Sequence, residues 1–188
     1  FKQIDQNHLL GTGGHGFYPD KLYHQDKGED FIANNQVEHI DCCSVHMYPK
    51  HWYEGEEDRV QNASEKGRDS IRRHAKDAHE IVEKPVYFGE FRPHTYVDRT
   101  AKDAEEKDGE RATILANWYD AMDGANVDGA IHWSFFDPYD NENNVVLVQR
   151  DEPLEGQYNG THVVYPWDEQ TVSVMESYSE AVDSKSTE

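Results

Sequence analysis

The sequence predicts an α/β fold of the (β/α)8 TIM-barrel type, of which this chain carries four strand–helix units. Short apolar segments alternate with longer segments that have helical periodicity, as expected for βαβ units with a parallel sheet. Four such units make up half of an eightfold barrel. Polar and aromatic residues follow the apolar segments, at the strand ends where barrels of this type place their chemistry.

Four short strands are expected. The first runs from about His8 to Gly13 and precedes a glycine-rich segment. The second covers about residues 41–47, and the third covers 85–90, whose mostly apolar composition is typical of buried parallel strands. The fourth covers 129–133 and leads into a long loop that ends near Tyr165.

Helices are expected at about residues 29–35, 63–83, 109–126 and 168–181, and the tail 183–188 is expected to fray. In the last three helices, residues at helical spacing form an inward face. These inward residues are Ile71, Ala75, Ala78 and Val82, then Ile114, Leu115, Trp118 and Met122, and finally Val172, Met175, Ser179 and Val182. The whole chain, residues 1–188, is expected to form half of one barrel.

The charge of the chain is strongly negative, with 38 acidic and 18 basic side chains giving a net charge of −20. A field of this sign repels nucleic acids and anionic membranes, so neither is an expected partner. The acidic residues are spread along the chain, as in salt-adapted, halophilic proteins, although an ordinary soluble acidic surface explains them equally well. Aromatic residues reach 12%, which argues for a folded core and suits a protein that presents rings to a ligand.

No metal or cofactor is expected from the sequence. The eleven histidines are dispersed and show no HExxH spacing, and the glycines between Gly11 and Gly16 lack the GK[ST] ending of a phosphate loop. Cys42 and Cys43 are adjacent, so they are expected to be small strand residues and not a disulfide. No apolar run approaches the roughly 20 residues of a membrane span, and the first residues do not resemble a signal peptide.

Glu90 is the leading candidate for chemistry, because it ends an apolar strand where a carboxylate is costly unless it is bonded or used. An ion pair with Arg92 or Arg99 is the structural alternative. His46 and Tyr48, at the end of the neighbouring strand, favour a functional role. A phenol there can donate to the carboxylate and orient it for attack on an anomeric carbon.

Aromatic side chains at the strand ends predict a sugar-binding surface. Trp133 follows the fourth strand, where its ring can contact the apolar face of a pyranose, although core packing is an equally simple reading. Trp52 and Tyr53 in the second loop, and Phe17 and Tyr18 in the first, extend the predicted aromatic cleft.

Several motifs resemble those of glycoside hydrolase family 5 endo-β-1,4-mannanases (clan A). The segments similar to barrel strands five and six are Gly14-His15-Gly16-Phe17-Tyr18, Gly28-Glu29-Asp30-Phe31-Ile32, and Ser44-Val45-His46-Met47-Tyr48-Pro49 with Trp52. Those similar to strands seven and eight are Lys84-Pro85-Val86, Gly89-Glu90-Phe91, Gly129-Ala130 and His132-Trp133. The motifs cover nearly the whole chain and occur in the family's order.

The resemblance implies a retaining enzyme that hydrolyses β-1,4-mannosidic bonds through a covalent glycosyl-enzyme on Glu90. His46 and Tyr48 would shape the surroundings of this nucleophile, and Trp133 would stack under the sugar at the cleavage point. The other substrate-binding residues implied are Trp52, His15 and Phe17. The expected partner is β-mannan or a related polysaccharide.

Two features depart from the family pattern. His15 stands where many relatives have an acidic residue. The acid/base glutamate of the family, which follows an Asn at the end of strand four, would lie upstream of Phe1, and Asn141-Glu142 is in the wrong place to replace it. We therefore expect little hydrolysis by this chain alone, and a partner in the missing N-terminal half or a second copy.

Other functions remain open at this point. A β-1,4-glucanase of the same clan, similar to cellulases, or a non-catalytic carbohydrate-binding protein would present similar aromatic residues. The tripeptides Asn62-Ala63-Ser64 and Asn159-Gly160-Thr161 fit the glycosylation pattern, which favours a secreted, extracellular protein.

Overall fold

The computed structural model describes residues 1–19, 28–49, 58–95, 101–136, 139–140, 145–146 and 163–185. These residues belong to two compact units. Unit 1 comprises residues 1–47, 67–91 and 121–132, and unit 2 comprises 48–66, 92–120 and 133–188. In the described part of the chain, no helix combines the length and the apolar character needed to cross a membrane.

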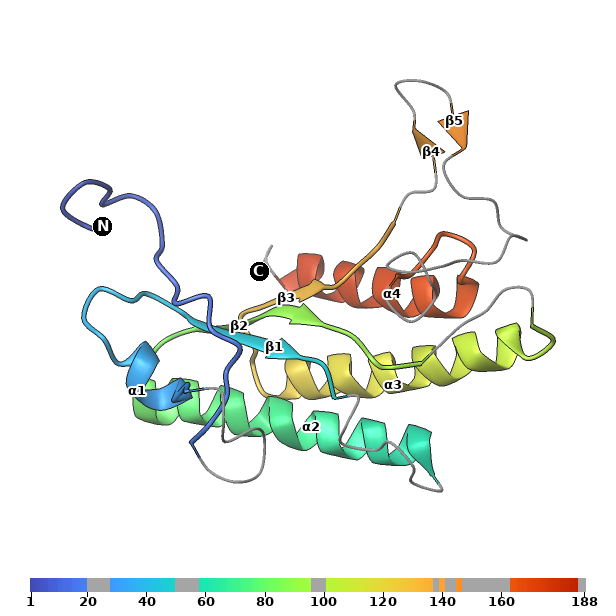
Figure 1. Cartoon of the computed structure of the whole chain (residues 1–188), viewed down its shortest axis with the longest axis horizontal. Coiled ribbons are helices and arrows are strands. Elements are labelled where there is room, and N and C mark those ends of the chain that lie inside the picture. Colours follow the sequence, from blue (N-terminus) through green and yellow to red (C-terminus); the bar gives the residue numbers. More distant parts are fainter. Residues whose placement is uncertain are drawn as a thin grey trace. The chain divides into compact units, whose positions relative to one another are not determined.

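The centre of unit 1 is a parallel sheet of three strands in the order β1-β2-β3 (Figure 1). Strand β1 is Cys43–Met47, β2 is Val86–Phe91 and β3 is Gly129–His132. These strands confirm the second, third and fourth predicted strands. Burial raises the pKa of the Cys43 thiol to about 11, so this side chain is a packed strand residue and not a nucleophile.

The predicted first strand, His8 to Gly13, is wrong as an element. Only Gly11 pairs, through a single parallel bridge to Cys42. Beyond it, Gly13 and Gly16 have positive φ angles of 65° and 84°, which no extended strand contains. The glycines that make this segment look like a loop therefore end the pairing before a strand can form.

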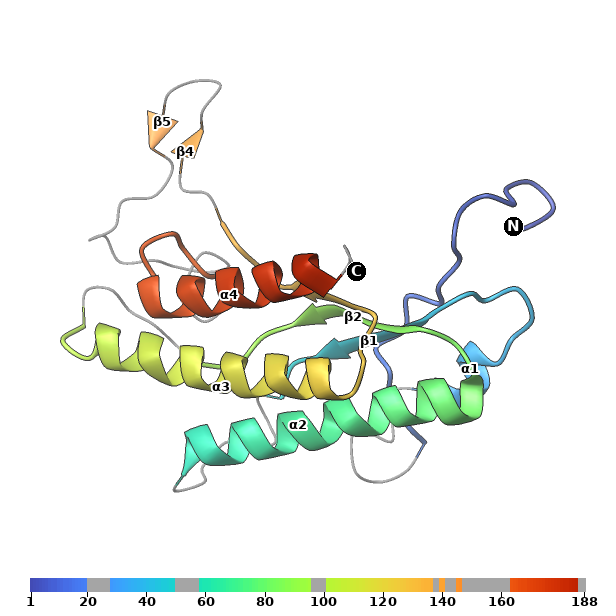
Figure 2. The ribbon, with the colours of Figure 1, turned by 180° about the vertical axis from the view of Figure 1, so that it is seen from behind.

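Two helical segments of unit 1 pack together at their ends. Helix α1, Phe31–Asn35, begins at Asp30, whose carboxylate accepts the N–H groups of Ile32 and Ala33. It lies against the π-helical turn η3, Ala78–Val82 (Figure 2), where Gln36 donates to the carbonyl of Ile81.

The long helix α2, Arg59–Asp77, continues directly into η3. It begins four residues before the predicted start at Ala63, and the chain leaves it at Glu83, which is left-handed with φ 58°. Its predicted inward face is confirmed, because all four members are buried: Ile71, Ala75, Ala78 and Val82. Asn62 of the first glycosylation tripeptide lies inside this helix, and Asn159 lies outside the described residues.

Helix α3, Ala104–Gly124, begins five residues earlier than predicted, with Glu105 and Glu106 in its first turn, where the helix dipole favours negative charge. Its predicted inner face is confirmed, since its members are fully buried: Ile114, Leu115, Trp118 and Met122. The Trp118 indole N–H also donates to the carbonyl of Ala63 at 3.0 Å.

Helix α4, Glu169–Lys185, lies in unit 2, and its predicted inward face is wrong in part. Ser179 is exposed and Val182 is 45% exposed, whereas Thr171 is fully buried and Tyr178 stacks on Tyr119 with ring centres 4.1 Å apart. The inward face is therefore offset by one residue. The helix also continues through residues 183–185, which were expected to fray.

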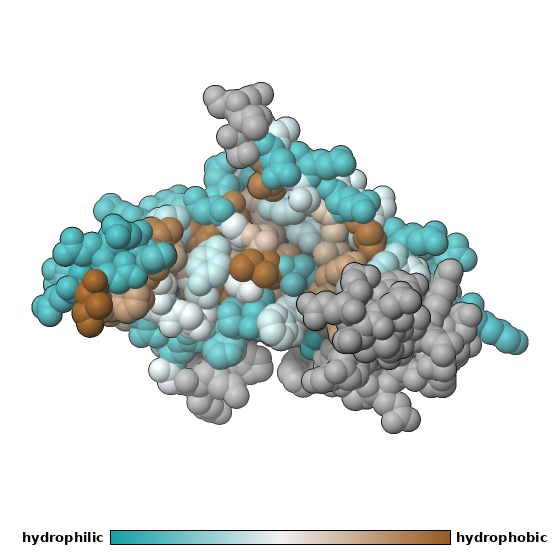
Figure 3. Space-filling view, turned by 90° about the horizontal axis from the view of Figure 1, so that it is seen from above, coloured by the Kyte–Doolittle hydropathy of each residue, from teal (hydrophilic) through white to brown (hydrophobic). Residues whose placement is uncertain are grey.

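The remaining described strands form a two-stranded antiparallel ribbon of β4, Tyr139–Asp140, and β5, Val145–Val146. Hydrophilic residues cover much of the described surface visible in Figure 3, with smaller hydrophobic patches between them. Leu9 at 76% and Ile131 at 58% are among the exposed large hydrophobic side chains.

Candidate active site

A β-bulge in strand β2 decides where Glu90 points. Val45 pairs with Phe88 and His46 pairs with Glu90, so Gly89 is an extra residue without a partner on β1. Strict alternation would have put Glu90 on the same side as Phe88, which is fully buried. The extra residue moves Glu90 to the opposite side, next to His46, and lets Phe91 take the buried position instead.

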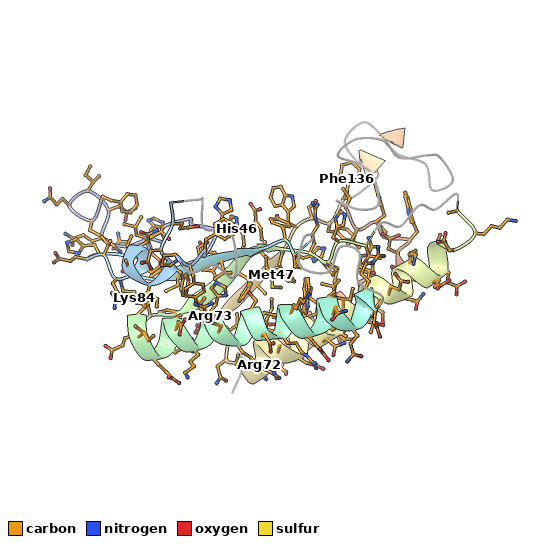
Figure 4. All side chains as sticks on the ribbon, turned by 60° about the horizontal axis from the view of Figure 1, so that its bottom comes forward. His46, Met47, Arg72, Arg73, Lys84 and Phe136 are labelled. Atoms are coloured by element: carbon orange, nitrogen blue, oxygen red, sulfur yellow. The ribbon has the colours of Figure 1, made fainter. Side chains whose placement is uncertain are left out.

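Gly89 suits the bulge because its neighbours leave little room for a side chain. A Cβ atom there would lie 3.1 Å from Cε2 of Tyr87 and 3.3 Å from Nε2 of His46. Any larger residue would therefore push against His46. Figure 4 shows His46 and Met47 on opposite sides of β1, with Met47 on the side of helix α2.

His46 and Glu90 form the central pair of the site. His46 Nδ1 lies 3.7 Å from Glu90 Oε2, and their side chains are 17% and 31% exposed. Burial lowers the pKa of His46 below its ordinary value near 6.5; Glu90 and Glu29 act in the opposite direction, and His15 adds to the lowering. At neutral pH the imidazole is therefore mostly neutral, and Glu90 is half-exposed to an incoming ligand.

Two further rings continue the surface from His46. The His15 ring meets the His46 ring edge-on, with centres 5.0 Å apart, and stacks in parallel on Phe17 at 5.5 Å. The sequence analysis predicted all three as site residues, and the structure places them together with Glu90 in unit 1. Flat rings beside a carboxylate suit a pyranose, which has apolar faces and polar edges.

The backbone that carries these rings is bonded at each carbonyl group. The carbonyl of His15 accepts the N–H of His46 at 2.9 Å, and that of Phe17 accepts the N–H of Phe31 at 2.8 Å. Between them, the carbonyl of Gly16 lies 2.7 Å from Nε2 of His74, a fully buried residue of α2. This segment is consequently held on strand β1, α1 and α2 at once.

His74 is a buried ionisable group of unit 1. Its Nδ1 lies 2.7 Å from the carbonyl of Ser70, so both ring nitrogens face carbonyl oxygens. Burial lowers the pKa of His74, and these two oxygens only partly oppose it. The neutral ring carries one N–H, so it donates to one carbonyl at a time.

The other three predicted site residues belong to unit 2 or lie outside the described residues. Tyr48, 36% exposed, and Trp133, 49% exposed, belong to unit 2. The guanidinium of Arg92 lies 5.1 Å from the centre of the Tyr48 ring. The approach of Tyr48 and Trp133 to Glu90 stays a prediction, and Trp52 lies outside the described residues.

The sequence analysis missed several residues that build the site. Gly89 was noted only as the neighbour of Glu90, and Glu29 was quoted only within a motif. His74 was not considered, although a polar residue three after Ile71 on the apolar face of a helix is a usable signal. In the described part of the chain, no group of three or more His, Cys, Asp or Glu residues could hold a metal ion.

Known proteins resemble this arrangement in sequence and in fold. No family model matches the chain. The chain is 28% identical over 180 residues to mannan endo-1,4-beta-mannosidase 3 of Solanum lycopersicum, covering 87% of this chain and 42% of that protein. It is 34% identical over 151 residues to mannan endo-1,4-beta-mannosidase 1 of Oryza sativa subsp. japonica, covering 73% and 33%.

Solved structures show the same fold. The endo-beta-1,4-mannanase of Thermotoga petrophila superposes with a TM-score of 0.62 at 20% identity, covering 95% of this chain and 37% of that chain. A glycoside hydrolase family 5 mannosidase of Rhizomucor miehei superposes with a TM-score of 0.61 at 18% identity, covering 94% and 44%. The chain thus has the fold of part of a glycoside hydrolase (β/α)8 barrel.

The sequence relatives agree with this fold, and both are mannan endo-1,4-beta-mannosidases by name. The chain spans about a third to two fifths of the length of the curated relatives it matches. Its three parallel strands correspond to part of their barrel.

Proposed function

We propose that this chain is part of a retaining endo-β-1,4-mannanase (mannan endo-1,4-β-mannosidase) in which Glu90 is the nucleophile. One observation carries the proposal: the bulge at Gly89 brings Glu90 next to His46, on the side of the sheet opposite the buried Phe88 and Phe91. The names of the relatives supply the substrate, since they are mannan endo-1,4-beta-mannosidases.

In the first step, a carboxylate oxygen of Glu90 attacks the anomeric carbon of a mannosyl unit, and the bond from that carbon to the glycosidic oxygen breaks. The leaving oxygen takes a proton from a second carboxyl group, which the family resemblance places outside this chain. In the second step, water attacks the same carbon and gives a proton to the second group, which is now a carboxylate; the bond from the carbon to Glu90 breaks, which releases the sugar and restores the Glu90 carboxylate.

The other residues bind and orient the sugar in this proposal. Neutral His46, 3.7 Å from Glu90, limits the directions that the carboxylate can adopt. His15 and Phe17 offer stacked rings to a pyranose. Tyr48, Trp133 and Trp52 are proposed to complete the site, with Tyr48 donating to Glu90 and Trp133 stacking under the sugar at the cleavage point.

The test uses the longer protein that contains this sequence and measures reducing-sugar release from β-mannan and from carboxymethyl-cellulose. Glu90→Gln should lower mannan turnover on the order of 10⁴-fold, because an amide cannot form the glycosyl-enzyme. Glu38→Gln, an exposed glutamate of the same unit, should leave turnover unchanged.

The outcomes separate the alternative functions. Faster turnover of carboxymethyl-cellulose than of mannan would replace the proposed substrate with a β-1,4-glucan. Binding of mannan oligosaccharides without turnover, equal in wild type and Glu90→Gln, would indicate a carbohydrate-binding protein. Turnover by the isolated 188-residue chain would contradict the need for a second carboxyl group from elsewhere.

A polymeric substrate is also consistent with an extracellular location, because mannan cannot enter a cell intact. The dispersed acidic residues further suggest activity at high salt. Both expectations are tested by locating the protein in culture fractions and by measuring turnover across salt concentrations.

A further inference from the structure

Glu29 lies beside the ring cluster and takes no part in the proposed reaction. It is half-buried, and its Oε2 accepts the N–H of Phe17 at 3.3 Å. Its other oxygen, Oε1, occupies the space that a Cβ atom at position 14 would need, so a side chain there would displace the carboxylate. The carboxylate therefore packs against the segment Gly14–Phe17, which carries the His15 and Phe17 rings.

Glu29 also adds a hydrogen bond to the backbone of this segment. The carbonyl groups of His15, Gly16 and Phe17 are held by His46, His74 and Phe31. The N–H of Phe17 points the other way, toward Glu29. With Glu29 in place, the peptide groups on both sides of the stacked rings are fixed.

We propose that Glu29 is a positioning residue of the sugar site: it clamps the Gly14–Phe17 segment and fixes the His15 and Phe17 rings against His46. The proposal deepens the proposed function, because it concerns how the same site receives a mannosyl unit. Without the clamp, the rings remain present, but part of the binding free energy is spent on ordering the segment that carries them.

The charge of Glu29 gives the proposal a second, independent signature. The charged groups that act on His46 are Glu90 from β2, His15 from the clamped segment and Glu29. Both carboxylates raise the pKa of His46 and His15 lowers it, with Glu90 the larger influence. Removing the negative charge at position 29 should therefore lower the pKa of His46, by less than Glu90→Gln does.

The experiment compares Glu29→Ala and Glu29→Gln in the full chain, with Glu38→Gln as the matched exposed control. NMR follows the Phe17 amide and the His46 imidazole titration, and calorimetry follows the binding of β-1,4-mannohexaose. Glu29→Ala should shift the Phe17 amide and weaken mannohexaose binding about fivefold, the effect of one lost hydrogen bond. Glu29→Gln keeps an oxygen acceptor, so binding should stay within about twofold while the His46 titration still moves down.

The two proposals fail in different ways. A Phe17 amide and a His46 titration that are the same in Glu29→Ala as in Glu38→Gln would overturn the clamp, whatever the ligand does. Equal loss of binding in Glu29→Gln and Glu29→Ala would also overturn it, because the amide preserves the acceptor. Failure of the wild-type chain to bind mannohexaose would count against the proposed substrate alone, since the NMR signals need no ligand.

Discussion

Arg111 in unit 2 and His46 in unit 1 both lie beside carboxylates, but their surroundings differ. Arg111 is 3% exposed, and its Nη2 lies 2.6 Å from Asp168 Oδ2 and 3.2 Å from Asp108 Oδ1. Its Nε donates to Thr171 at 3.0 Å. Each of these partners is itself buried, so the cluster joins α3 to the start of α4 with its bonds directed inward.

The side chains of His46 and Glu90 are farther apart and more exposed to solvent than those of the Arg111 cluster. Their 3.7 Å separation is an ion-pair distance but too long for a good hydrogen bond, and almost a third of Glu90 is exposed. A buried charge with saturated bonds fixes the fold and has nothing to offer a ligand. A partly exposed carboxylate can be reached by an incoming molecule. The contrast separates a charge that is buried within the fold from a charge that a ligand can reach.

The largest effect on stability should follow from Arg111→Ala. Asp108 and Asp168 would remain buried without their shared cation, which costs about 3–5 kcal/mol. Urea unfolding measures the loss. Arg72→Ala removes an exposed arginine from α2 and should change the free energy of unfolding by less than about 0.5 kcal/mol. If Arg111→Ala and Arg72→Ala lowered the free energy of unfolding equally, the Arg111 cluster would have no special structural role.

Gly89→Ala tests the second member of the comparison, the partly exposed pair of His46 and Glu90. The new methyl group must displace Tyr87 and His46, at a cost of about 1–3 kcal/mol in unfolding free energy. Binding of mannohexaose should weaken as well, because His46 moves relative to Glu90. The control is Gly124→Ala, where a methyl group meets nothing within 4 Å, and the better helix former should leave stability equal or slightly higher. A fully active Gly89→Ala variant would show that the site tolerates a shifted His46.

The smallest effect is expected from mild acidification. Burial holds the pKa of His74 below the ordinary 6.5, so between these two values the unfolded chain binds more protons than the folded one. The stabilising contribution of His74 is complete above pH 6.5 and is lost as the pH falls toward the folded pKa. Urea titrations at several pH values should show a gentler decline in His74→Gln than in wild type. An identical decline would assign the pH dependence to other groups.

The parts of the fold that were predicted correctly depend on local patterns. Strands β1, β2 and β3 are runs of apolar residues, and the inner faces of α2 and α3 follow from helical spacing alone. Glu90 was identifiable because a carboxylate ending such a run is unusual. His46, His15 and Phe17 came from motifs on neighbouring segments, which parallel strands bring to one edge.

The parts that were missed depend on contacts between distant segments. The inward face of α4 is set by Thr171, which looks polar in the sequence but donates to Asp108 at 2.6 Å inside unit 2. The bulge at Gly89 depends on His46, 43 positions earlier, and no pattern within β2 reveals it. Glu29 acts on a backbone N–H twelve residues away, and a backbone donor has no signature in a sequence.

The unpaired residue in β2 also makes the pairing register of this strand a chemical variable. If β2 paired with β1 without the bulge and with every residue retained, Glu90 would enter the buried layer of Phe88, and Phe91 would turn to the side of His46. Deleting Gly89 would instead restore continuous pairing with Phe88 still opposite Val45 and Glu90 still opposite His46, so the glutamate would keep its side. For chains like this one, the register of the strand is therefore as informative as the presence of the glutamate.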